Sequence, residues 1–85
     1  MAVIKVYTSR YCGYCSAAKH LLSSHGYEFE EIDLQGDREL MLEVMRKSGQ
    51  RTVPQIFIGE HSVGGYRELL AASTSGELAQ LVAGN

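Results

Sequence analysis

The chain has 85 residues, of which 45% are hydrophobic, with one proline and a net charge of -2. This length suffices for one small domain and is too short for two, so we expect residues 1–85 to form a single domain. The near-neutral charge gives no reason to expect binding to nucleic acid or to an anionic membrane surface. No apolar stretch approaches the roughly 20 residues of a membrane helix, and the first residues lack the pattern of a secretory signal. We therefore expect a cytoplasmic protein.

The chain begins with a strand followed by a helix. Residues 3–7 are rich in β-branched and aromatic side chains, which predicts a buried strand. From Tyr14 onward, apolar residues recur at helical spacing as far as His25, and Gly26 is suited to end this helix.

A second strand and helix follow. Residues 27–34 predict a strand, but the alternation of apolar residues changes phase at Glu30 and Glu31. We expect a bulge or a late strand start there. Asp37 as an N-cap and Gly49 as a stop predict a second helix between them.

The last third of the chain predicts a hairpin and a helical end. Residues 53–65 supply two short strands joined around Gly59 and Glu60. Residues 66–73 predict a helix, and the capping-box pattern over Thr74–Glu77 predicts the start of another. The order β-α-β-α-β-β-α predicts an α/β domain of two or three layers, with a mixed four-stranded sheet flanked by helices.

Cys12 and Cys15 lie three positions apart at the expected start of the first helix. A thiolate is the nucleophile in disulfide exchange, and the N–H groups and dipole at a helix start stabilise this anion. Residues three apart are neighbours on a helix, so the Cys15 sulfur can attack a mixed disulfide formed on Cys12. The spacing predicts a catalytic pair, with Cys12 as the nucleophile, Cys15 as the resolving thiol and a reversible disulfide between them.

A zinc site is the main alternative that the residues allow. Cys12, Cys15, His20 and His25 have spacings close to those of zinc-binding cysteines and histidines. Cys15 and His20 are five positions apart, about 140 degrees around a helix, so they do not converge on one ion. We therefore expect no metal ligands here.

Three motifs in this order resemble those of the glutaredoxins, in the thioredoxin-fold superfamily. They are Cys-x-x-Cys at the first helix, Thr52-Val53-Pro54 before the third strand, and Gly64-Gly65 at the end of the hairpin. The resemblance is to the short bacterial dithiol type and covers essentially the whole chain. It implies a thioredoxin fold and a glutathione-dependent oxidoreductase that reduces protein-glutathione mixed disulfides and protein disulfides. The implied partners are glutathione, as co-substrate, and such proteins, with the chain as a monomer.

The resemblance also implies a glutathione site. It implies a cis peptide bond before Pro54, which leaves the Val53 backbone free to pair with an extended peptide. The alternative is that Pro54 only starts an edge strand. Tyr66 and Arg67 are implied as main-chain donors to a carboxylate, and Tyr14 either lines the groove or lies at the edge of the core. The expected glutathione-binding residues are Arg10, Tyr14, Arg51, Thr52, Val53, Pro54, Gly65, Tyr66 and Arg67.

Two departures from the family pattern bear on function. Gly13 follows the first cysteine, where proline is usual. Some glutaredoxins with a small residue there resemble this chain and hold a [2Fe-2S] cluster between two subunits, which would use Cys12 as a ligand. Arg67 and Glu68 replace an acidic pair, and Arg67 cannot accept a hydrogen bond from the glutathione ammonium. Glu68 is then the acid within reach.

A third departure is Ser9, which stands where a lysine is usual. Arg10 or Arg51 is expected to supply the missing positive charge, unless both are solvated surface residues. A glutathione-independent, thioredoxin-like reductant is a further alternative. Arg67 favours it, whereas the absence of tryptophan beside the cysteine motif disfavours it.

Overall fold

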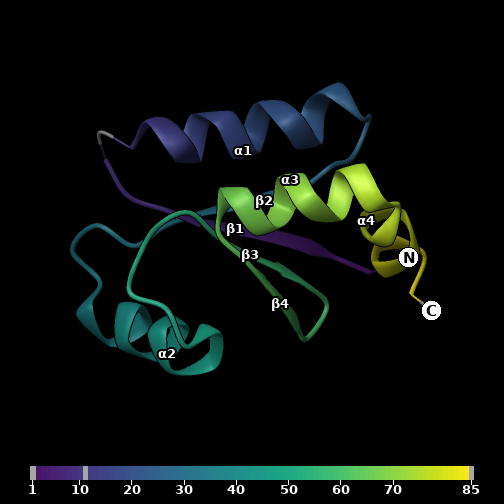
Figure 1. The fold of residues 1–85 in the computed structure, drawn as a ribbon. Coiled ribbons are helices and arrows are strands. Elements are labelled where there is room, and N and C mark those ends of the chain that lie inside the picture. Colours follow the sequence, from purple (N-terminus) through teal and green to yellow (C-terminus); the bar gives the residue numbers. More distant parts are fainter. Residues whose placement is uncertain (1, 11, 85) are drawn as a thin grey trace.

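The computed structural model describes residues 2–10 and 12–84, drawn as a ribbon in Figure 1. Its elements are β1 (Ile4–Thr8), α1 (Gly13–Ser24), β2 (Glu30–Asp33), α2 (Arg38–Ser48), β3 (Gln55–Ile58), β4 (His61–Gly64), α3 (Tyr66–Ser75) and α4 (Glu77–Ala83). This is the expected order of strands and helices, with the helical end in two pieces. No helix formed by these residues is long and apolar enough to cross a membrane.

The four strands form one mixed sheet in the order β2-β1-β3-β4. β1 and β2 are parallel and are joined through α1, whereas β3 is antiparallel to both β1 and β4. These relations confirm the predicted crossover and the predicted hairpin. Because β3 lies inside the sheet, the alternative that Pro54 starts an edge strand is wrong.

The sheet separates two hydrophobic cores. Figure 1 shows α1 and α3 on one face of the sheet and α2 on the other, so the domain has three layers. Leu22 and Ile56 are fully buried in the larger core, between the sheet and the pair α1 and α3. Leu34, Val44 and Phe57 form the smaller core beneath α2.

Local signals place the ends of the first two helices where the sequence predicts them. Gly26 follows α1 with φ +78. The Asp37 carboxylate accepts a hydrogen bond from the Leu40 N–H at 3.1 Å, and Gly49 ends α2 in the left-handed conformation. The late start of the second strand at Glu30 is also confirmed.

The predicted capping box over Thr74–Glu77 is wrong. Thr74 lies inside α3, and its hydroxyl donates to the Leu70 carbonyl at 3.0 Å. Gly76, with φ +88, ends α3 and also precedes α4 without a side-chain cap. A threonine hydroxyl can bond the carbonyl four residues earlier as readily as it caps a helix, and the left-handed glycine decides where the helix breaks.

Candidate active site

Cys12 is the N-cap of α1 and is partly exposed. Its sulfur accepts a hydrogen bond from the Cys15 N–H at 3.2 Å. Its thiol donates to the Val53 carbonyl at 3.6 Å, beside the groove described below. The first N–H groups of a helix lack helical partners, and the N–H of Cys15 takes the Cys12 sulfur as its partner. This position suits the nucleophile of a disulfide exchange.

Cys15 lies on the inner face of α1 and is only 3% exposed. Burial raises the pKa of this thiol from its ordinary 9.0 to about 12, and the hydrogen bond with Cys12 adds to the rise. A hydrogen bond from the Ser9 backbone and the charge of Lys19 act in the opposite direction. The two cysteines therefore differ in a way that the sequence does not reveal: Cys12 is partly exposed, whereas Cys15 is buried and its pKa is raised.

The raised pKa of Cys15 predicts a loss of stability in alkaline solution. Between about pH 9 and pH 12 the unfolded chain loses the Cys15 proton while the folded chain keeps it, so this stabilisation is complete below pH 9 and falls above it. We expect the free energy of unfolding of the reduced wild type to fall by about 1.4 kcal/mol per pH unit more steeply than that of Cys15→Ser. Urea unfolding at about pH 10 and about pH 11 measures this, and equal slopes would contradict it.

A groove of about 450 Å³ lies beside the Cys12–Val53 contact. It contains every expected glutathione-binding residue except Arg10 and Arg51. Arg51 instead lines a smaller cavity of about 190 Å³ with Ser9, while Arg10 is exposed. The groove is lined by Tyr14, Gln50, Thr52, Val53, Pro54, Gly65, Tyr66, Arg67 and Glu68.

One wall of the groove is the loop before β3. The Val53–Pro54 peptide bond is cis, as the resemblance implies. Gln55 is 1% exposed and donates from Nε2 to the Thr52 carbonyl at 2.8 Å and to Gln50 Oε1 at 2.9 Å. A buried amide thus fixes the loop that presents the Val53 backbone.

The opposite wall is the start of α3. The Tyr14 ring stacks on that of Tyr66, with centroids 6.0 Å apart, and Tyr14 is 62% exposed. Tyr14 therefore lies on the groove, and the alternative at the edge of the core is wrong. The N–H groups of Tyr66 and Arg67 fall in the first helical turn, where no carbonyl of the helix can receive them.

Glu68 is an exposed lining residue of the groove. Its Oε1 accepts the Gly65 N–H at 2.7 Å and the Gln50 amide at 3.5 Å. Gly64 has φ +113, and a Cβ there would come within 2.7 Å of Glu68 Oε1. Arg67 is also exposed and lines the groove, so charges of both signs border it. Gln50 is a lining residue that no sequence signal indicates.

The histidines of α1 are not gathered around the cysteines. His20 is exposed, and His25 lies at the other end of the helix, where Nε2 is 3.2 Å from the Ser73 hydroxyl. The His25 ring also stacks on Tyr27. Among residues 2–10 and 12–84, no three His, Cys, Asp or Glu side chains are placed to hold a metal ion.

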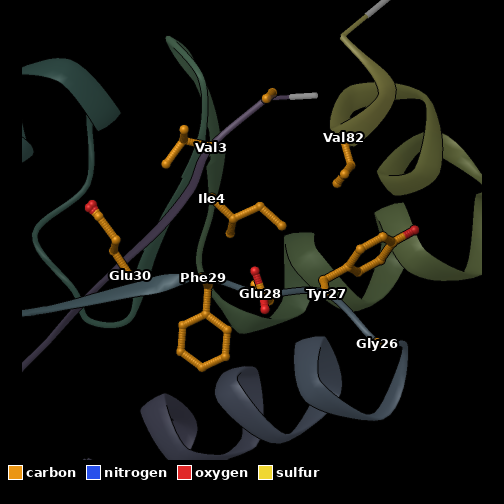
Figure 2. A pocket seen from close by; sticks show the side chains of 9 residues that line it. Val3, Ile4, Gly26, Tyr27, Glu28, Phe29, Glu30 and Val82 are labelled. Atoms are coloured by element: carbon orange, nitrogen blue, oxygen red, sulfur yellow. The ribbon is translucent and has the colours of Figure 1, made fainter.

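A larger cavity, of about 530 Å³, lies at the opposite end of the domain. Figure 2 shows the side chains of Ile4, Tyr27 and Val82 converging there, beside Gly26 at the end of α1. This cavity adjoins the beginning of β1, whereas Cys12 follows the end of β1. Its lining includes neither Cys12 nor Val53, whereas the smaller groove shares Val53 with the Cys12 contact, so the smaller groove is the candidate redox site.

Comparisons with known proteins agree with this geometry. The glutaredoxin family model matches residues 4–63. A glutaredoxin of Pseudomonas aeruginosa is 45% identical over 82 residues, covering 96% of this chain and 98% of its own. Glutaredoxin 3 of Escherichia coli is 42% identical, covering 96% of this chain and 99% of its own.

Solved structures give the same result. A solution structure of glutaredoxin from Brucella melitensis is 44% identical with a TM-score of 0.85, covering 96% of this chain and 89% of its own. A buckwheat glutaredoxin-glutathione complex is 29% identical with a TM-score of 0.87, covering 96% of this chain and 77% of its own. The fold is the thioredoxin fold, and the chain belongs to the glutaredoxin family of thiol-disulfide oxidoreductases.

Proposed function

We propose that this chain is a glutathione-dependent oxidoreductase that reduces protein-glutathione mixed disulfides and protein disulfides. The observation that carries the proposal is the groove, which is lined by Val53 and the start of α3 and lies beside the contact of the Cys12 thiol with the Val53 carbonyl. The buckwheat relative is a glutathione complex with the same fold, which supports glutathione as the ligand. That the chain acts as a cytoplasmic monomer stays a prediction.

The first half of the reaction uses Cys12. Its thiolate attacks the glutathione sulfur of a mixed disulfide, so a Cys12-glutathione disulfide forms and the protein substrate leaves as a thiolate that takes up a proton. A second glutathione thiolate then attacks the glutathione sulfur held on Cys12. Glutathione disulfide leaves, and Cys12 returns as the thiolate at the N-cap.

The groove walls position the bound glutathione. The backbone of Val53 pairs with the extended peptide, as a strand pairs with its neighbour. The free N–H groups of Tyr66 and Arg67 receive the γ-glutamyl carboxylate at the start of α3. Tyr14 covers the groove with its ring. Arg10 and Arg51 stay predicted partners of the glycyl carboxylate.

For protein disulfides, both cysteines take part. Cys12 forms a mixed disulfide with the substrate, and Cys15 attacks the Cys12 sulfur to release the substrate as a dithiol. The resulting Cys12–Cys15 disulfide is reduced by glutathione. Burial of Cys15 means that the substrate meets Cys12 first.

Arg67 allows a sharp test of glutathione dependence. Its guanidinium repels the glutathione ammonium, and its exposure limits the size of the effect. We expect the wild type to turn over a glutathionylated peptide with glutathione, and Arg67→Asp to lower the KM for glutathione about fivefold with little change in kcat. The matched control is Arg38→Asp, an exposed arginine at the start of α2 that does not line the groove.

The other outcomes separate the alternatives. Reduction of the oxidised chain by thioredoxin reductase, without turnover by glutathione, would show a thioredoxin-like reductant instead. A KM that rises equally in both arginine variants would remove Arg67 from the glutathione site. The [2Fe-2S] hypothesis, with Cys12 as ligand, is tested separately by anaerobic reconstitution with glutathione and by light scattering for a dimer.

A further inference from the structure

A cluster of polar side chains lies beside Cys15, between α1 and the sheet edge. Lys19 Nζ is 3.2 Å from Glu31 Oε1 and 3.1 Å from Glu31 Oε2. The Thr8 hydroxyl donates to Glu31 Oε2 at 3.0 Å. Thr8 is 3% exposed, whereas the Lys19 and Glu31 side chains are 32% and 43% exposed. Two partners therefore fix the Glu31 carboxylate, and the carboxylate fixes the ammonium of Lys19.

The sheet register explains why these groups meet. Glu31 is paired with Val6, and Thr8 follows two residues later, so all three side chains project from the same face of the sheet. Val6 packs in the core beneath α1. Lys19 lies four residues after Cys15 and so on the same side of that helix. The ammonium is therefore held one helical turn from the buried thiol.

The two-cysteine route requires Cys15 to react as a thiolate. It must lose a proton while buried, although burial and the neighbouring Cys12 both disfavour the thiolate. Lys19 is a positive charge that lowers the pKa of Cys15, and its ammonium is paired with Glu31. Tyr66, the first residue of α3, also lies at this end of the domain, where its ring stacks on that of Tyr14.

We propose that Lys19, held in place by Glu31 and Thr8, is a positioning residue that assists the resolving attack of Cys15. In this step the Cys15 sulfur attacks Cys12, the bond between Cys12 and the substrate sulfur breaks, and the proton lost by Cys15 ends on the released substrate thiol. No other reactant is required. The inference rests on the two-cysteine route of the proposed function and adds a residue to it.

The expected size of the effect follows from two opposing consequences of the charge. Lowering the pKa of a protonated thiol by one unit raises its thiolate fraction about tenfold, but makes the thiolate intrinsically about threefold less nucleophilic. The net gain is about threefold per unit. A nearby opposite charge lowers a pKa by about one to three units. Because the Lys19 side chain is one-third exposed, its charge is partly screened and its effect lies at the low end of that range. We therefore expect Lys19 to speed the resolving step by about threefold.

The test uses an aromatic disulfide whose released thiolate is coloured, so it needs no glutathione. Attack by Cys12 releases one coloured thiolate, and resolution by Cys15 releases the second, which stopped-flow absorbance follows. We expect Lys19→Met to slow the second phase about threefold at neutral pH, while Lys19→Arg, which keeps the charge, restores it. Added salt should slow the wild type more than Lys19→Met, because it screens the charge.

The matched control is Lys47→Met, which removes another lysine that is paired with a glutamate, in this case one four positions earlier in the chain. Lys47 is 2.9 Å from Glu43 on the exposed face of α2, far from the cysteine pair in the chain. Its second phase should equal that of the wild type. Equal second phases in Lys19→Met and the wild type, or an equal loss in Lys19→Arg, would overturn the inference about Lys19. Absence of a second phase in the wild type would instead contradict the two-cysteine route itself. Turnover of a glutathionylated peptide with glutathione tests the one-cysteine function separately.

Discussion

Replacing Cys12 with serine is expected to lower the turnover of a glutathionylated peptide roughly a thousandfold or more, because no other group can form the covalent intermediate. A serine hydroxyl stays protonated at neutral pH, so the helix start has no anion to stabilise. Cys15 cannot replace it, since it is 3% exposed and its pKa is raised. A coupled assay of glutathione disulfide formation measures the loss.

Cys15→Ser is the matched variant for this prediction. With the glutathionylated peptide, its turnover should stay within about threefold of the wild type, because the one-cysteine route needs only Cys12. With a protein disulfide as substrate, the same variant should stop at the mixed disulfide, which mass spectrometry detects on Cys12. An equal loss of peptide turnover in both variants would show that resolution by Cys15 is obligatory.

Gly64→Ala is expected to destabilise the domain by about 2–3 kcal/mol and to weaken glutathione binding as well. The backbone at Gly64 has φ +113, a conformation that costs an alanine roughly 1–2 kcal/mol. The new Cβ would also lie 2.7 Å from Glu68 Oε1, so the carboxylate must leave the Gly65 N–H. Loss of such a cap typically costs about 1 kcal/mol.

Urea unfolding and the KM for glutathione check this prediction together. Gly49→Ala is the control, because Gly49 also has positive φ, +72, but its added Cβ would meet no atom within 4 Å. We expect Gly49→Ala to cost only about 1 kcal/mol and to leave the KM unchanged. If the two variants lose equal stability, the contact with Glu68 contributes nothing to the Gly64 effect.

The parts of the fold that depend on local chemistry were predictable. Asp37 and Gly49 delimit α2 because a side-chain cap and a left-handed glycine act over a few residues. Thr74 shows the limit of this reasoning, since its hydroxyl has two local partners and the sequence does not say which one it takes. The number of layers was also open, because the face that α2 covers depends on packing over the whole sheet.

The same distinction applies to the site. Cys12, Pro54 and Gly65 were predictable because their chemistry or backbone conformation is tied to residue type. The position of Arg51, away from the groove lining, and that of Gln50, within it, depend on how the loop after α2 folds. The contact between Lys19 and Glu31 depends on strand register, which pairs residues from separate elements, so the order of elements alone does not reveal it.

The unequal exposure of the two sulfurs also determines which of them an incoming thiol attacks. Cys15 is buried on the inner face of α1, while Cys12 is partly exposed and contacts Val53 beside the groove. Of the two sulfurs in a Cys12–Cys15 disulfide, an incoming thiol approaches that of Cys12, so one of the two possible adducts predominates. In the proposed reaction the substrate and glutathione therefore both react at the Cys12 sulfur, and Cys15 reacts only with Cys12.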